Sequence, residues 1–371
     1  MADRGHNGSE RRAERSRLRN HKRIGTEGTV TSSAATGTAT PRTVASPAPG
    51  ANSVGRTRRG DGDHKRRRHQ RLVVLAFMSP WIIGFGVFFV YPLLATVFLS
   101  FTSYDLISDP IWVGVKNYVF MFTSDPLVWT AIRNTTYLVV AITIGRVGYA
   151  LASAMVLSKV RRGSGVFRTL FYLPALAPPV AAALAFVFLF NPGTGPVNQV
   201  LGWFGIKGLL WFNDPLLAKP ALTVLALWAS GEIMVILLAA LLDVPTEYYE
   251  AAALDGAGSF TRFWHITLPT IAPVLTFAVI NSIIVGLQYF TEAVVAGAVA
   301  SGSSDAVGSG TQLGYPDNST LTFPMWLYQQ GFHYYNMGYA STMAIVLFIV
   351  SAIFTVILVR QLRKSGMTEE D

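Results

Sequence analysis

Three ionisable side chains stand alone inside long apolar runs of this 371-residue chain: Arg146, Glu232 and Glu292. An isolated charge in such a run is costly unless it has a partner or a functional task. Arg146 and Glu232 each lie about 15 residues from the same end of their runs, roughly 22 Å along a helix that rises 1.5 Å per residue. The equal depth predicts that the two charges pair across neighbouring helices. A purely structural ion pair and a contact with a substrate are both open.

A second group of polar side chains lies along the fifth apolar run. Asn281, Gln288, Tyr289 and Glu292 follow one another at spacings of 7, 1 and 3 residues, which favours a shared side of one helix. Amide, hydroxyl and carboxylate groups beside an aromatic ring suit a sugar, which has polar edges and apolar C–H faces. We therefore expect these residues to line a pathway for a polar ligand. Structural packing between helices is the alternative, since Tyr and Gln are common there.

The sequence lacks the patterns that mark an enzyme. There is no cysteine, so thiolate metal sites and cysteine nucleophiles are excluded. No phosphate-cradling G-x-x-x-x-G-K-[S/T] loop, H-E-x-x-H helix or G-x-S-x-G elbow occurs. Four of the six histidines fall in the first 69 residues, and His265 and His333 are far apart in sequence. We expect no catalytic residue, no metal site and no cofactor bound by this chain.

The elements that must position these side chains are membrane-spanning helices. The chain is 51% apolar and only 14% charged, a balance typical of a polytopic membrane protein. Six runs are long enough to cross about 30 Å of hydrocarbon as helices. The expected fold is all-α, with spans near 72–100, 131–157, 168–190, 217–243, 272–297 and 337–360.

Charge placement predicts how these spans are oriented. Of the 30 Lys and Arg residues, 17 lie in residues 1–71, and cationic segments stay on the cytoplasmic side. Counting every loop gives 25 cations on that side against 4 on the other, so both termini are expected in the cytoplasm. Residues 1–70 are expected to be a disordered basic tail, 71–364 the transmembrane domain and 365–371 a short cytoplasmic tail. Nucleic-acid binding is not expected, because no aromatic residues are interleaved with the basic ones.

The cytoplasmic segment 244–270 predicts a short helical hairpin. Pro245 ends the preceding helix, Thr246 can cap a new one, and Gly256 and Gly258 permit a reversal that needs positive φ. Ser259 can cap a second short helix, with Phe260, Phe263 and Ile266 on one face, that stops at Pro269. From physics alone, an amphipathic hairpin on the membrane surface and a docking helix for a partner's groove are equally open.

The residue sequence of this hairpin resembles a family signature. Glu250-Ala251-Ala252, then Asp255-Gly256-Ala257, then Ile266, Leu268 and Pro269 are similar to the "EAA" loop of the membrane subunits of binding-protein-dependent ATP-binding-cassette importers. Further matches point to the sugar-importing, MalF/UgpA-like branch: Tyr91-Pro92, Asn117-Tyr118, Asn134-Thr135, Leu173-Pro174 and Gly338-Tyr339-Ala340-Ser341. One departure is a longer Gly/Ser-rich stretch over 298–324, with Tyr315-Pro316 where that branch has a Gly-Gly-Pro turn.

The resemblance implies a role for the hairpin and a set of partners. It assigns Glu250, Ala251, Ala252, Asp255, Gly256 and Ala257 to a coupling helix that docks into a separate ATPase subunit, which binds ATP and Mg. It also implies a second permease subunit, an extracellular solute-binding protein and a carbohydrate substrate such as a mono- or oligosaccharide or glycerol phosphate. Another solute class, such as amino acids or polyamines, and an ion-coupled carrier are the alternatives.

Overall fold

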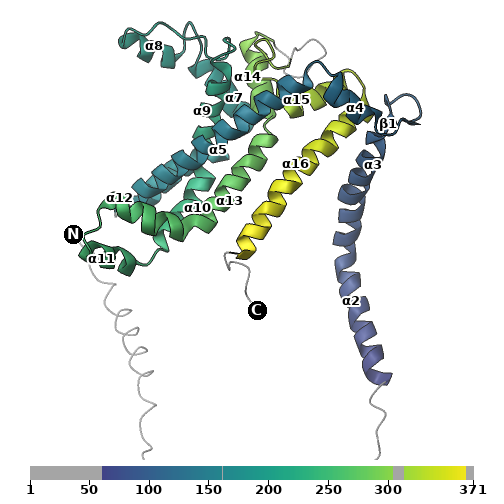
Figure 1. Ribbon diagram of the computed structural model, residues 1–371, viewed down its shortest axis with the longest axis horizontal. Helices are drawn as coiled ribbons and strands as arrows, with labels where there is room; N and C mark the ends of the chain where they lie inside the picture. Colours follow the sequence, from purple (N-terminus) through teal and green to yellow (C-terminus); the bar gives the residue numbers. More distant parts are fainter. Residues whose placement is uncertain (1–60, 161, 304–312, 365–371) are drawn as a thin grey trace, which may run out of the picture. The chain divides into compact units, whose positions relative to one another are not determined.

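The computed structural model describes residues 61–160, 162–303 and 313–364 (Figure 1). The tails expected at residues 1–60 and 365–371 therefore lie outside the described residues. Helix α2 begins at Asp61, so residues 61–70, which we expected to be disordered, are helical. Lys and Arg are good helix formers, and here they extend the helix of the apolar run that follows them.

Apart from turns and loops, the described residues are helical except for one two-residue strand pair. The strands β1 (Thr102–Ser103) and β2 (Ile111–Trp112) pair antiparallel, with Thr102 opposite Trp112. In chain order the helical elements are α2 (Asp61–Phe85), η1 (Gly86–Val90), α3 (Tyr91–Ser100), α4 (Lys116–Thr123), α5 (Val128–Ser158), α6 (Ser164–Tyr172), η2 (Leu173–Leu176), α7 (Pro179–Leu189), α8 (Pro196–Trp203), α9 (Ala218–Trp228), α10 (Gly231–Leu242), α11 (Thr246–Leu254), α12 (Ser259–Arg262), η3 (Phe263–Thr267), α13 (Leu268–Leu287), α14 (Thr291–Ala300), α15 (Phe323–Tyr328), η4 (Gln329–His333) and α16 (Met337–Lys364).

Within the described residues, four helices are long and apolar enough to cross a membrane, and the number rises to six if each of two bent pairs is one span. The four are Val73–Ser100, Val128–Ser158, Ser259–Leu287 and Met337–Arg363. The bent pairs fall in the expected third and fourth spans. The all-α fold with up to six spans thus agrees with the sequence, and the differences concern how individual spans are built.

The expected third span is sharply broken. Helices α6 and η2 cover Ser164–Leu176, α7 covers Pro179–Leu189, and the two parts are bent by 99°. Ala177 and Pro178, between them, are extended, with ψ of 133° and 134°. Tandem prolines explain this break, because each lacks a backbone N–H and keeps the preceding residue out of the helical region.

The expected fourth span bends by 51° between α9 and α10. Ser230 lies at this bend, and its Oγ donates to the Leu227 carbonyl oxygen over 2.6 Å. Gly231 begins α10 against the backbone of α6, where a Cβ would collide with the Phe171 carbonyl oxygen. The glycine therefore permits a close approach that any larger residue would prevent.

The expected fifth span is displaced towards the N-terminus. The continuous helix runs over Ser259–Leu287, whereas we expected residues 272–297. Residues 288–290 interrupt it, and α14 starts afresh at Thr291. The displacement arises because the second arm of the predicted hairpin continues into the span instead of stopping at Pro269.

Helix α5 is the centre of the packing. It packs against α9, α10, α13 and α15, while α16 packs against α3 and α13 (Figure 1). One buried cluster includes Leu138 and Ile142 of α5 with Leu222 of α9. A second includes Ala154 of α5 with Leu237 of α10. The hairpin formed by α11 and α12 lies at one end of this bundle, and α4, α14 and α15 lie at the other (Figure 1).

Candidate functional site

The first arm of the hairpin, α11, ends in a well-formed helix stop. The Ala257 N–H donates to the Ala252 carbonyl over 2.9 Å, and the Gly256 N–H donates to the Ala253 carbonyl over 3.1 Å. Gly256 has φ of +78°. These two bonds with a left-handed glycine form a Schellman motif, which satisfies carbonyls that the helix end would otherwise leave unpaired. The Ala-Ala and Gly-Ala pairs of the signature therefore shape the reversal between the arms.

The capping residues differ from those the sequence suggested. Pro245, not Thr246, occupies the N-cap of α11, and it makes no side-chain capping bond. Gly258, not Ser259, occupies the N-cap of α12 in an extended conformation, with φ of −69°. Only Gly256 of the two hairpin glycines needs positive φ. The prolyl ring and the extended glycine set the chain direction where we expected hydroxyl caps.

The second arm of the hairpin is continuous with a membrane span. Helices α12, η3 and α13 follow one another without a gap from Ser259 to Leu287. The five residues Phe263–Thr267 are π-helical, and the Leu268 N–H donates to the Phe263 carbonyl. Because this turn is widened, Pro269 can follow it without ending the helix, so our expectation of a stop there was wrong. The second hairpin arm and this span therefore form one continuous helical element.

The two arms are fastened to each other at their base. The Tyr249 hydroxyl of α11 lies 2.9 Å from the Thr267 Oγ1 of η3, and Thr267 is buried. Val244, just before α11, is also buried. Along the second arm, Phe260 is 76% exposed, while Phe263 and Ile266 are partly buried.

The tip of the hairpin exposes the residues of the signature. Glu250, Ala251, Asp255 and Gly256 are exposed, whereas Ala252 and Ala257 are half-buried at the reversal. Leu254, between them, is 90% exposed. Small residues around one large exposed apolar side chain form a surface that another protein can approach closely.

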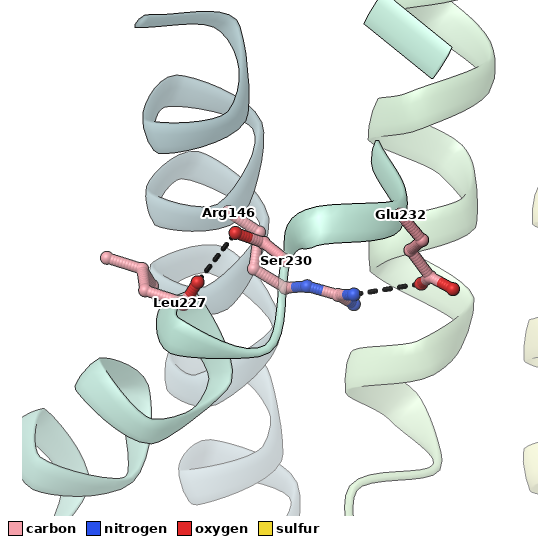
Figure 2. A network of polar contacts seen from close by, with 4 residues as sticks. All are labelled: Arg146, Leu227, Ser230 and Glu232. Atoms are coloured by element: carbon pink, nitrogen blue, oxygen red, sulfur yellow. Dashed lines mark hydrogen bonds and ion pairs between the residues drawn. The ribbon is translucent and has the colours of Figure 1, made fainter. Parts of the chain in front are cut away.

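The Arg146 and Glu232 side chains meet between α5 and α10. Arg146 Nη2 donates to Glu232 Oε1 over 3.0 Å, as Figure 2 shows. The Arg146 side chain is 7% exposed and that of Glu232 is 52% exposed. Glu232 lies in the first turn of α10, which starts at the bend held by Ser230 and Leu227 (Figure 2). A carboxylate there also complements the helix dipole. The two charges predicted to lie at equal depth are thus in direct contact.

The four residues expected to line a ligand pathway do not share one helix. Asn281 lies on α13, Gln288 and Tyr289 lie in the interruption after it, and Glu292 lies on α14. Tyr289 is buried in the core, and its hydroxyl donates to the Leu222 carbonyl over 3.3 Å. Gln288 is exposed, and Asn281 and Glu292 are partly buried. The assumed helical spacing was therefore wrong, and the Tyr289 ring packs in the protein interior.

At the opposite end of the bundle, a buried carboxylate that the sequence analysis did not select joins three helices. Asp125 Oδ1 accepts from the Leu127 and Val128 N–H groups that begin α5, over 2.8 and 2.9 Å. Its Oδ2 accepts from Trp326 Nε1 over 2.9 Å and from the Tyr339 hydroxyl over 2.6 Å. The signal for this residue was local, because an Asp shortly before an apolar helical run can accept hydrogen bonds from backbone N–H groups two and three residues ahead.

Residues quoted for the family resemblance also meet at this end. Asn134 Nδ2 donates to the Asn318 and Leu321 carbonyls over 2.8 and 3.1 Å, and the Phe323 N–H donates to Thr135 Oγ1 over 2.8 Å. These bonds join α5 to the segment before α15. Asn134 and Thr135 therefore help to hold this end of the bundle together.

Comparison with known proteins defines the class of this chain. Residues 146–365 match the model of the family described as binding-protein-dependent transport system inner membrane component. The chain belongs to that family, and is an inner-membrane transport component of ATP-binding-cassette importers.

Individual relatives cover most of the chain. It is 38% identical to the Probable ABC transporter permease protein YesP of Bacillus subtilis over 78% of this chain and 90% of YesP. It is 33% identical to the arabinooligosaccharides transport system permease protein AraP of Halalkalibacterium halodurans over 77% of this chain and 86% of AraP. A crystal structure of a bacterial ABC transporter involved in the import of the acidic polysaccharide alginate shares the fold, with a TM-score of 0.66, 20% identity, and coverage of 81% of this chain and 99% of that one.

Proposed function

We propose that this chain is a permease subunit of an ATP-driven importer that moves a sugar or oligosaccharide, delivered by an extracellular binding protein, across the cytoplasmic membrane. The observation that carries the proposal is the similarity to AraP along three quarters of the chain. The resemblance of Asn134-Thr135 and the other quoted residue pairs to the sugar-importing branch supports the same solute class.

The hairpin is the proposed contact with the ATPase. Its exposed tip, with Glu250, Ala251 and Asp255 around Leu254, suits insertion into a groove of a partner. The continuous helix from Ser259 to Leu287 supports transmission of the partner's movement into the bundle. In this proposal ATP and Mg are bound by the ATPase, and closure of two ATPase copies pulls the coupling helices together and opens the cavity outward.

A second permease and the binding protein complete the proposed assembly. The span Val73–Ser100 has no buried residue in its most apolar window, so it has ample surface for lipid or for a partner subunit. The distribution of cations supports an orientation with both termini and the hairpin in the cytoplasm. The binding protein would then meet the opposite end of the bundle, where α4 and α15 lie.

For the solute pathway we retain Asn281, Gln288 and Glu292, because they are not sealed in the core. Tyr289 is assigned to positioning, through its bond to the Leu222 carbonyl. Gln288→Ala and Glu292→Ala should each reduce uptake at unchanged expression, whereas Tyr289→Phe should lower stability more than it lowers solute affinity. Normal uptake by both alanine variants would contradict the pathway assignment.

The direct test of the function is uptake by reconstituted vesicles. The chain, its second permease, its ATPase and its binding protein should accumulate labelled oligosaccharide only with ATP, and vanadate should stop the accumulation. Uptake of amino acids or polyamines, and not of oligosaccharide, under the same conditions would show that the proposed solute class is wrong. Uptake driven by a proton or sodium gradient without the ATPase would refute the importer itself.

A further inference from the structure

A cationic groove separates the base of the hairpin from the ends of two membrane helices. It has a volume of about 430 Å³ and lies among the C-terminal ends of α5 and α10, the start of α11 and the second hairpin arm. The signature residues at the hairpin tip do not line it. The groove is therefore separate from the surface proposed for the ATPase.

The charges in this groove have one sign. Lys159 and Arg262 both line it, and none of its lining residues is acidic. Among the described residues, neither cation lies within ion-pair distance of a carboxylate. Asp243 and Glu247 are nearby in sequence, but both are exposed and neither lines the groove. Two cations directed to one concave surface without a counter-ion attract an anion.

The remaining polar lining consists of hydroxyl groups. Ser158, Thr246, Tyr249, Ser259 and Thr267 contribute them. The Tyr249 and Thr267 hydroxyls lie 2.9 Å apart, and the Thr267 hydroxyl also donates to the Arg262 carbonyl over 3.5 Å. The hydroxyl donors offered to a ligand are therefore those of Thr246 and Ser259. Helix α11 begins at the groove without a side-chain cap. Because the Tyr248 N–H donates to the Pro245 carbonyl over 3.3 Å, the Thr246 and Glu247 N–H groups are the donors that its first turn adds.

Two cations with several hydroxyl and N–H donors match the oxygen atoms of a phosphate group. We propose that this groove binds a phosphate-bearing anion, with Lys159 and Arg262 as its charged ligands. The phosphate is supplied by the headgroup of an anionic lipid or by a soluble phosphate compound. Because residues of α5, α10 and the hairpin all line the groove, the bound anion bridges them and holds the hairpin against the bundle. This inference does not depend on the imported solute.

The test is thermal unfolding of the full-length chain, purified in detergent with the subunits that accompany it. The probes are short-chain phosphatidylglycerol, inorganic phosphate at constant ionic strength, and short-chain phosphatidylcholine as the zwitterionic control. A ligand that binds the folded state raises the unfolding temperature in a saturable way. Each cation contributes about 1 kcal/mol towards an anionic headgroup, so Lys159→Gln or Arg262→Gln should weaken apparent affinity about fivefold and the double variant roughly 25-fold.

The matched control removes two exposed cations outside the groove, Arg162→Gln with Arg360→Gln, and should leave the affinity unchanged. Protection by phosphatidylglycerol alone identifies a lipid headgroup, and protection by inorganic phosphate identifies a soluble source. No saturable protection from either probe, or equal losses in both double variants, would overturn the proposal. If the double groove variant does not fold, competition between phosphate and phosphatidylglycerol for the unaltered protein tests whether the two share one site. Phosphate should reduce the apparent affinity for phosphatidylglycerol, and independent saturation would refute a shared site.

Discussion

Removing Glu232 alone should destabilise this protein more than removing Glu232 and Arg146 together. The two side chains meet at 3.0 Å, and the Arg146 side chain is only 7% exposed. Its Nε is buried and has no hydrogen-bond partner among the described residues, so Glu232 is the principal compensation for this charge. Glu232→Gln would leave a buried guanidinium without its counter-charge, whereas the double change removes both charges from the apolar bundle.

The magnitude follows from distance and exposure. Two unit charges about 4 Å apart interact by about 4 kcal/mol at an effective dielectric constant of 20. The Glu232 side chain is 52% exposed, so screening lowers this figure, and we expect a coupling free energy of about 2 kcal/mol. Glu232→Gln should then cost about 2–3 kcal/mol, and Arg146→Gln with Glu232→Gln about 1 kcal/mol.

The assay is a double-mutant cycle on denaturant unfolding of the detergent-solubilised chain. A matched cycle pairs Arg146→Gln with Glu250→Gln, an exposed hairpin residue, and should give a coupling within about 0.5 kcal/mol of zero. If the losses from Arg146→Gln and Glu232→Gln are additive, so that their coupling free energy is as small as that of the matched cycle, the reasoning is refuted. The contact between the two side chains would then contribute nothing measurable to stability.

Three further substitutions test local features of the structure. Gly256→Ala should cost about 1 kcal/mol by forcing Ala into a positive φ of +78° and should weaken ATPase retention; unchanged unfolding and retention would contradict the Schellman reversal. Asp125→Asn should cost about 2 kcal/mol in denaturant unfolding because a buried charged acceptor is lost. Unchanged stability would contradict the inference that the Asp125 carboxylate holds the three helices together. Gly338→Ala should cost about 3 kcal/mol in denaturant unfolding or prevent folding, since the Cβ would collide with the Thr102 carbonyl oxygen. The control Gly148→Ala, whose Cβ would meet no atom within 4 Å, should be tolerated. Equal effects of the two substitutions on stability would contradict the close approach at Gly338.

Hydropathy predicted the fold well where a helix is continuous. Apolar length alone identified the spans that the structure forms as α5 and α16. Counting residues along the two apolar runs was sufficient to predict the contact between Arg146 and Glu232, because the distance of a residue from the end of a helix follows from the rise per residue. The family signature located the hairpin, and Gly256 adopts the backbone conformation that its residue type suggests.

What sequence reasoning missed depends on tertiary packing. The interruption at residues 288–290 contains neither Pro nor Gly, and Tyr289 there is drawn into the core by contacts with α9. Pro269 resembles a helix stop, but the preceding π-helical turn accommodates it. Such widening depends on the neighbouring helices, so residue types alone cannot locate it.

The contact between the hairpin tip and an ATPase is tested most directly by filling the exposed small-residue surface. Ala251 is exposed, so Ala251→Phe should leave unfolding of the isolated chain unchanged while it blocks close approach of a partner. We predict loss of ATPase co-purification and of ATP-driven uptake, with both retained in the control Arg162→Phe on the neighbouring loop. Full ATPase retention and normal uptake by Ala251→Phe would contradict the account.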